Sequence, residues 1–485
     1  MKEKDHRIVI IGAGSAGLCM GMQLKKSGIN DFVILEKGPA LGGTWYWNKY
    51  PGAECDVQSH LYSFDFEQKL DWSRPFARQA EILEYLNIIA NKYDVRRHIQ
   101  FNCETTQLEW QQSQNHWLVS TTESIVYKSH VLISAVGMFN DIHWPKIPGI
   151  NDFEGNYWHS ARWENTHDLA GERVGVIGLA ASAIQFTPEI APIVNQLHLF
   201  QRTANWVVPK SNAPYTQREI NYYRQHPAAV QKSREETYAV WNKLATFSDK
   251  VFLADMEKSG LERISEVTDT TTRENLKPKH PFGCKRPLFS DLYYPIFNRD
   301  NVELVTYDIE QITNNGIRTS DGKTRELDTI IFATGFKTTA YLSTILVTGS
   351  DGLKLTDAWQ DGAQAYLGLS TAGFPNLFML YGPNTNQGSL LYMIERQCEY
   401  VIQQLKRFDE ENLAWMDIKP DVMSSFNDQL QADVDKIEVW KFDCGNSFYN
   451  RAPSGRFVTT WPHSMDRYTE LLSAQNFKIY NVGSK

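Results

Sequence analysis

An α/β fold with two nested dinucleotide-binding (Rossmann-like) domains and a helical insertion in the second is predicted from three observations. An apolar strand, a glycine-rich turn and a helical segment follow one another at the N-terminus, and the same order recurs from residue 174. A further apolar strand at 329–335 then leads into the last third of the chain. At 485 residues the chain is long enough for two or three domains.

The first unit begins with the buried strand 7–11, followed by the pattern GxGxxG at Gly12, Gly14 and Gly17. The first glycine permits a tight turn, the second lets a pyrophosphate approach the backbone, and the third lets helix and strand pack closely. A second strand ends in Glu36, whose carboxylate is suited to hydrogen-bonding ribose hydroxyls. This order of elements at the start of a long chain indicates an FAD site.

The second unit repeats the pattern with Gly178, Ala180 and Ala183 at the fixed positions, and Ser182 in the same turn is a further candidate for cofactor binding. The strand that follows ends at Arg202 and Thr203. The cation and hydroxyl stand where the first unit has its acid, so they indicate a 2′-phosphate and therefore NADPH rather than NADH. Ala180 replaces the middle glycine, and its Cβ lies where a pyrophosphate would approach. Because of Ala180, two alternatives stay open: the second unit binds its cofactor weakly or in a displaced position, or it no longer binds a cofactor.

Composition excludes several classes of function. The net charge of −8 and the lack of a long basic run argue against a nucleic-acid partner. The six cysteines form no CxxC pair and show no metal-ligand spacing with histidine, so we expect no metal site and no dithiol reductase. The sequence contains no run of eighteen apolar residues, so no membrane span is predicted. The first strand begins so early that it leaves no room for a signal peptide, and a cytoplasmic protein is therefore expected.

Prolines in the segment 144–149 suit a linker between units. The expected division is therefore a first part of the FAD domain at 1–143, the NADP domain at 144–330 and a second part of the FAD domain at 331–485. Helical spacing predicts an insertion at about 214–270, which is either a cap over the NADP half or a surface hairpin without function. Apolar faces at 391–405 and 422–434 predict two further helices.

Two longer motifs carry a resemblance to a known family. Residues 42–56 match GGxWxxxxYPGxxxD, and residues 153–163 match FxGxxxHxxxW. Both patterns resemble signatures of the type I Baeyer–Villiger monooxygenases, FAD- and NADPH-dependent enzymes similar to phenylacetone and cyclohexanone monooxygenases. On this resemblance the fingerprint residues are Phe153, Gly155, His159 and Trp163, and the flavin side includes Gly43, Thr44, Trp45, Asp56 and Tyr62.

The resemblance implies further roles. The segment 281–302 resembles the family's stretch with the active-site arginine, which places Arg286 on the catalytic position and Lys285 beside Arg202 at the 2′-phosphate. Asp56 is expected to hold and tune Arg286, and Trp440 to touch the nicotinamide nucleotide.

The implied reaction uses NADPH and O₂ to insert one oxygen atom beside a ketone carbonyl through a flavin peroxide, giving an ester or lactone. A peroxide anion needs a permanent cation, which an arginine supplies. His159, on the linker between the units, is expected to affect coupling rather than proton transfer.

Two other functions stay open. A flavin-containing monooxygenase that oxidises nitrogen or sulfur is a near alternative, and ketone-oxidising members also accept sulfides. A second alternative is an FAD-binding redox sensor or slow NADPH oxidase, favoured by Ala180 and by Glu54, which stands where the family usually has arginine. The sequence indicates neither the ketone nor any protein partner.

Overall fold

The computed structural model describes residues 2–244, 246–442, 451–474 and 477–485. Its larger unit contains an eight-stranded sheet in the order β17-β4-β5-β6-β1-β2-β3, with β18 also paired to β6. The strands are β1 (Lys2–Ile11), β2 (Phe32–Leu35), β3 (Ile99–Gln100), β4 (Thr105–Gln111), β5 (His116–Thr121), β6 (Ile125–Ser134), β17 (Leu346–Thr348) and β18 (Leu377–Met379). Strands β3, β2, β1, β6 and β18 are parallel, whereas β4 and β5 are antiparallel additions.

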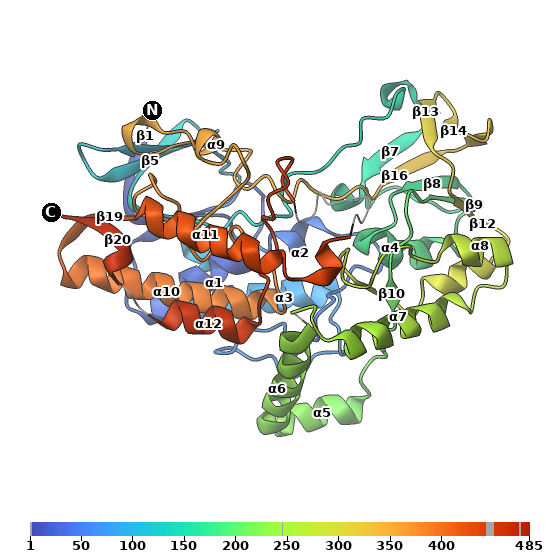
Figure 1. Cartoon of the computed structure of the whole chain (residues 1–485), viewed down its shortest axis with the longest axis horizontal. Coiled ribbons are helices and arrows are strands. Elements are labelled where there is room, and N and C mark those ends of the chain that lie inside the picture. Colours follow the sequence, from blue (N-terminus) through green and yellow to red (C-terminus); the bar gives the residue numbers. More distant parts are fainter. Residues whose placement is uncertain (1, 245, 443–450, 475–476) are drawn as a thin grey trace.

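Helices cover this sheet because its central strands are apolar on both faces. Residues 8–11 of β1 and all of β2 are buried. The covering helices are α1 (Ser15–Lys26), α3 (Gln79–Lys92) and α10 (Leu390–Glu410), with α11 (Pro420–Val434) and α12 (Met465–Ser473) beyond them (Figure 1). The short elements α2 (Thr44–Trp47), α9 (Leu355–Ala358), β19 (Leu413–Ile418) and β20 (Tyr480–Ser484) complete the unit.

The second unit has a five-stranded parallel sheet in the order β12-β9-β8-β16-β7. Its elements are β7 (Asn156–His159), β8 (Arg173–Ile177), α4 (Ala181–Ile190), β9 (Gln196–Phe200), β12 (Val302–Val305) and β16 (Thr329–Phe332). Smaller sheets are formed by β10 (Val207–Val208) with β11 (Leu288–Phe289) and by β13 (Ile309–Thr313), β14 (Gly316–Thr319) and β15 (Thr324–Glu326). The strand expected at 329–335 ends at Phe332 and lies inside this sheet, just past the expected domain limit of 330.

Short 3-10 turns lie between these elements, at Arg96–His98, Ile150–Asp152, Ser160–Arg162, Tyr294–Asn298, Ser350–Gly352, Glu438–Trp440 and Phe477–Ile479. The helices in the described ranges all lack the combination of length and apolar composition that a bilayer crossing needs.

The insertion of the second unit is helical, as the sequence predicts. It contains α5 (Gln217–Gln225), α6 (Pro227–Leu244), α7 (Lys250–Ile264) and α8 (Thr270–Asn275), and α5 and α6 project from the body of the molecule (Figure 1). Helix α6 nevertheless contacts the first unit. The buried Arg234 donates through Nη1 to the carbonyl oxygens of His60, Leu61 and Ser63. The insertion is therefore fastened to the segment that also carries Tyr62.

The chain crosses between the units twice, and the two crossings are joined. A β-bridge pairs Ile142 of the first crossing with Phe336 of the second. The amide of His143 donates to Gly335 O at 2.9 Å, and Thr334 Oγ1 donates to His143 O at 2.6 Å. The two connections therefore form one structural element between the units.

Candidate active site

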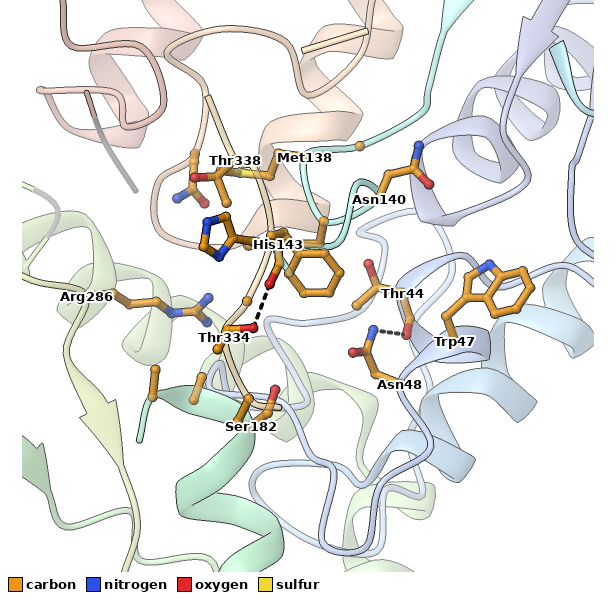
Figure 2. Close-up of a pocket in the computed structure, with 18 of the residues that line it drawn as sticks. Thr44, Trp47, Asn48, Met138, Asn140, His143, Ser182, Arg286, Thr334 and Thr338 are labelled. Atoms are coloured by element: carbon orange, nitrogen blue, oxygen red, sulfur yellow. Dashed lines mark hydrogen bonds between the residues drawn. The ribbon is translucent and has the colours of Figure 1, made fainter. Parts of the chain in front are cut away.

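A cavity of about 940 Å³ lies between the two units and is lined by both. This volume is in the range of pockets that hold organic cofactors and substrates. The predicted site residues that line it are Gly12, Gly14, Glu36, Gly43, Thr44, Trp45, Asp56, Tyr62, Gly178, Ala180, Ser182, Arg202, Thr203, Lys285, Arg286 and Trp440. In Figure 2, Arg286 extends into the cavity from the second unit and faces Thr44 and Asn48 of the first.

The first glycine motif has the geometry that close packing requires. A Cβ on Gly17 would lie 1.9 Å from Gly12 O, so only a glycine lets α1 approach the turn this closely. Gly12 has a φ of +102°, a conformation that L side chains rarely adopt. Gly14 faces the cavity, where the nearest neighbour of an added Cβ is Gly43 Cα at 3.5 Å. The backbone is therefore open to a ligand at Gly14.

Glu36 is held by the backbone of the same turn. Its Oε2 accepts from Ala13 N at 2.7 Å, and its Oε1 accepts from Gly38 N at 2.7 Å. The carboxylate is buried yet lines the cavity. Since each carboxylate oxygen has two lone pairs, both oxygens can still accept from ribose hydroxyls.

The second motif differs from the first at Ala180 without backbone strain. Ala180 precedes α4 with a φ of −110°, which any residue adopts, whereas Gly178 has a φ of +92° and no room for a Cβ beside Ala333 O. Ala180 and Ser182 both line the cavity at the N-terminus of α4. The helix can therefore still present its backbone amides to an anion.

A cationic cluster lies beside this helix. Lys285 Nζ donates to Thr203 Oγ1 at 2.6 Å. Burial and the neighbouring charge of Arg202 lower the pKa of Lys285. Two cations and a hydroxyl that lie together in this way match the donors that a 2′-phosphate would need.

The aromatic loop that includes α2 forms the opposite wall. Trp45 Nε1 donates to Tyr62 Oη at 3.1 Å, and both rings line the cavity. The Arg162 guanidinium stacks over the Trp47 ring, 4.3 Å from its centroid. This stack joins the fingerprint segment to the loop, because Arg162 directly precedes Trp163.

Asp56 and Arg286, 230 positions apart, meet across the units. Arg286 Nη2 lies 3.0 Å from Asp56 Oδ2, and the Asp56 side chain is 11% exposed whereas that of Arg286 is 41% exposed. Glu54 lies two residues before Asp56, and its Oε1 is 2.8 Å from Nζ of the buried Lys210. The guanidinium therefore combines a carboxylate partner with access to the cavity.

The fingerprint residues and Gly17 do not line the cavity. Phe153 packs in the apolar cluster under β16, and a Cβ on Gly155 would meet Asp328 O at 2.4 Å. Trp163 contacts the Phe186 ring of α4, with centroids 5.1 Å apart. These contacts give Phe153, Gly155 and Trp163 a packing role in the second unit.

His159 is buried at the end of β7, and its Nδ1 accepts from Ala161 N at 3.1 Å. Burial lowers its pKa to about 4, so the imidazole is neutral near pH 7. A neutral ring outside the cavity agrees with the expectation that His159 does not transfer protons.

Trp440 lines the cavity from the C-terminal part. Its Nε1 donates to Gly283 O at 3.1 Å, which ties it to the loop that carries Lys285 and Arg286. The Trp440 ring stacks on Phe457 with centroids 4.6 Å apart.

Several lining residues were not predicted from the sequence. They are Lys37, Asn48, Met138, Asn140, His143, Thr334 and Thr338, most of them labelled in Figure 2. Five of these, Met138, Asn140, His143, Thr334 and Thr338, lie on or beside the two crossings, and no spacing signal marks such positions. Lys37 directly follows Glu36, and that adjacency was the available signal.

The residues fit both dinucleotides that the motifs indicate. Gly14, Gly43 and Glu36 would hold FAD in the first unit, and Ala180, Ser182, Arg202, Thr203 and Lys285 would hold NADPH in the second. No group of three or more His, Cys, Asp or Glu side chains suited to a metal ion occurs in the described part of the chain.

Residues 9–244 match the family model described as pyridine nucleotide-disulphide oxidoreductase. The match covers the dinucleotide-binding segments, and the chain has no CxxC pair that would serve disulfide chemistry.

Full-length relatives are more specific. A Baeyer–Villiger monooxygenase of Pseudomonas aeruginosa is 38% identical over 98% of this chain and 91% of its own length. One from Streptomyces coelicolor is 36% identical over 94% of this chain and 88% of its own length. The crystal structure of cyclohexanone monooxygenase from Rhodococcus sp. Phi1 bound to NADP⁺ superposes with a TM-score of 0.90, at 29% identity and full coverage of both chains.

Proposed function

The chain belongs to the type I Baeyer–Villiger monooxygenase family, and we propose that Arg286, held by Asp56, is the residue through which it oxidises ketones. The observation that carries the assignment is the ion pair between Asp56 Oδ2 and Arg286 Nη2 at the wall of the inter-unit cavity. It combines a fixed carboxylate with a cation that is open to the cavity.

The enzyme uses FAD and NADPH. In the overall reaction a ketone, O₂, NADPH and one proton give an ester or lactone, NADP⁺ and water. Bound FAD supplies the activation of oxygen with electrons from NADPH. The protein supplies binding, orientation, charge and exclusion of water.

Arg286 supplies the charge. A guanidinium keeps its proton at any working pH and can stabilise negative charge on oxygen during the attack on a carbonyl carbon. Asp56 sets the position of this cation, because its carboxylate is mostly buried and binds Nη2 of the guanidinium. The 41% exposure of Arg286 leaves it accessible to substrate.

Arg202, Thr203 and Lys285 bind the 2′-phosphate of NADPH in this proposal. Lys285 and Arg286 are adjacent in the chain, so the loop that recognises the nucleotide also carries the reacting cation. Trp440, bonded to Gly283 of that loop, closes the cavity beside it.

The test compares product with peroxide. The purified enzyme, NADPH and a panel of cyclic and linear ketones are incubated, and ester, hydrogen peroxide and NADPH are quantified. Arg286→Met should lower ester formation by about 10²-fold or more while NADPH oxidation continues and hydrogen peroxide accounts for the electrons. Lys258→Met, an exposed substitution on α7, serves as the control.

Equal ester yields from Arg286→Met and the unaltered enzyme would refute the role of Arg286. A parallel series with sulfides separates Baeyer–Villiger oxidation from heteroatom oxidation. Oxidation of sulfur uses a protonated oxidant, which needs no cation to stabilise it. Sulfide oxidation without any ketone conversion would favour the heteroatom monooxygenase alternative.

A further inference from the structure

Lys210 is a charged side chain that the sequence motifs do not include. It follows β10, and its side chain is 1% exposed. Its Nζ lies 2.8 Å from Glu54 Oε1 and 3.4 Å from Asp56 Oδ1. An ammonium group is retained in such a place only when carboxylates compensate its desolvation.

Asp56 therefore lies between two cations. Its Oδ1 faces Lys210 and its Oδ2 faces Arg286 Nη2 at 3.0 Å. A carboxylate bound to a cation at each oxygen cannot rotate without breaking one of the two contacts. The orientation of Asp56 toward Arg286 thus depends on Lys210.

Lys210 is itself fixed by its backbone. Its amide donates to Asp291 Oδ1 at 3.0 Å, and the amide of Ser211 donates to Asp291 Oδ2 at 2.8 Å. The ammonium lies 5.2 Å from the centroid of the Phe76 ring. The cation is consequently held in one place against the first unit.

Glu54 is fixed as firmly as Lys210. Asn212 Nδ2 donates to Glu54 Oε2 at 2.8 Å, so both carboxylate oxygens have partners. The backbone of Glu54 is bound by Gln185 of α4, which accepts from Glu54 N at 3.3 Å and donates to Glu54 O at 3.0 Å. The Glu54 carboxylate therefore cannot swing toward Arg286.

These contacts explain the exchange at position 54. The resemblance expects an arginine there, whereas this chain has Glu54 together with the buried Lys210. The pair Glu54–Lys210 adds no net charge, and it leaves a positive group beside Asp56. Without Lys210, Asp56 would keep Arg286 as a cation partner, whereas Glu54 would keep the hydrogen bond from Asn212 but lose its cation.

We infer that Lys210 is a positioning residue of the active site, a buried cation that orients Asp56 and through it Arg286. The inference rests on the proposed function for its consequence in catalysis, but its geometry is independent of it. Lys210 belongs to the second unit and both of its carboxylate partners belong to the first. It therefore also sets the register of the two units at the reacting arginine.

The kinetic test uses Lys210→Met, which keeps the length of the side chain and removes its charge. We expect kcat for ketone oxidation to fall by about tenfold or more and the share of electrons lost to hydrogen peroxide to rise. KM for NADPH should change less than about twofold, since Lys210 does not line the cavity, whereas Arg202 and Thr203 do. Lys210→Arg should restore most of the activity, and Lys258→Met is the exposed control.

The double variant Glu54→Gln/Lys210→Met separates positioning from simple neutralisation. If Lys210 serves only to compensate Glu54, removal of both charges restores kcat, which would overturn the inference. If Lys210 orients Asp56, the double variant stays as impaired as Lys210→Met. Flavin content and melting temperature of each variant identify a loss of kcat that comes from misfolding. If Lys210→Met misfolds, the double variant decides, because it leaves no buried Glu54 charge without its cation: a restored kcat overturns the inference and an impaired kcat supports it.

A crystal structure of the Lys210→Arg and Lys210→Met variants tests the geometry without any substrate. In Lys210→Met, we expect Asp56 to turn away and its contact with Arg286 to be lost, whereas Lys210→Arg keeps it. An unchanged Asp56–Arg286 contact in Lys210→Met would overturn the inference. If the enzyme converts no ketone, the proposed function fails, and this structure still decides the role of Lys210.

Discussion

Replacement of Arg234 by methionine tests whether the contacts of the helical insertion with the first unit stabilise the fold around the cofactor site. Arg234 is 5% exposed, and its Nη1 lies 3.0, 3.2 and 2.9 Å from the carbonyl oxygens of His60, Leu61 and Ser63. It also lies 3.3 Å from Asp65 Oδ1 and 3.8 Å from Glu395 Oε2. Methionine keeps most of the aliphatic stem and removes every one of these donors.

The magnitude follows from the contacts. One nitrogen carries two hydrogens, so two full hydrogen bonds are lost, each worth roughly 1.5–3 kcal/mol because the donor is charged. The lost ion pairs add little, since Asp65 is exposed and burial raises the pKa of Glu395 to about 7, which lets it take up a proton. We expect the free energy of unfolding to fall by about 4 kcal/mol.

Urea unfolding is followed by flavin fluorescence and by far-UV circular dichroism, with linear extrapolation to water. Lys232→Met on the same helix is the matched control, because Lys232 is 77% exposed and pairs only with Glu236 at 3.8 Å in the described contacts. The control should change stability by less than about 0.5 kcal/mol. An Arg234→Met effect below about 1 kcal/mol would refute the reasoning and leave the insertion as a surface hairpin.

Three further outcomes follow from the same geometry. Gly17→Ala should give protein without FAD, seen as lost flavin absorbance per chain, because its Cβ would lie 1.9 Å from Gly12 O; stoichiometric flavin would contradict this. Burial lowers the pKa of His60 to about 4, so below pH 6.5 the unfolded chain binds a proton that the folded chain does not. The free energy of unfolding should therefore fall by up to about 3 kcal/mol between pH 6.5 and 4. Melting curves recorded across this pH range should show a smaller fall for His60→Gln. Ala180→Gly should change KM for NADPH by less than about threefold, since Ala180 is unstrained; a tightening above tenfold would mean that its methyl obstructs the nucleotide.

Local patterns predicted the parts of the fold that depend on neighbours in sequence. The turn at Gly12, Gly14 and Gly17 and the acid at Glu36 lie within one strand–helix–strand unit, so their spacing is enough to place them. The apolar faces at 391–405 and 422–434 likewise form α10 and α11. The antiparallel strands β4 and β5 were not predicted, because the pairing of β5 with β4 and with β6 is a tertiary property.

Residues that meet across long separations needed more than a pattern. Asp56 and Arg286 were paired by resemblance to a family, and the structure brings them to 3.0 Å. Lys210 had no such guide, since its partners lie 154 positions or more away and a lysine after a proline signals nothing by itself. Glu54 was interpreted as a sign of impaired NADPH use, because Lys210, the cation that compensates its charge, lies in the other unit and far away in sequence.

The joined crossings at Ile142 and Phe336 have a consequence for engineering the molecule. A single connection would let one unit rotate about any axis relative to the other. Two connections that are hydrogen-bonded to each other restrict that rotation to a single axis. If the second unit is transferred to another flavoprotein, both connections must therefore be transferred with it. Lengthening either one with a flexible spacer would remove this restraint, and the position of Arg286 relative to Asp56 would no longer be fixed by the connections.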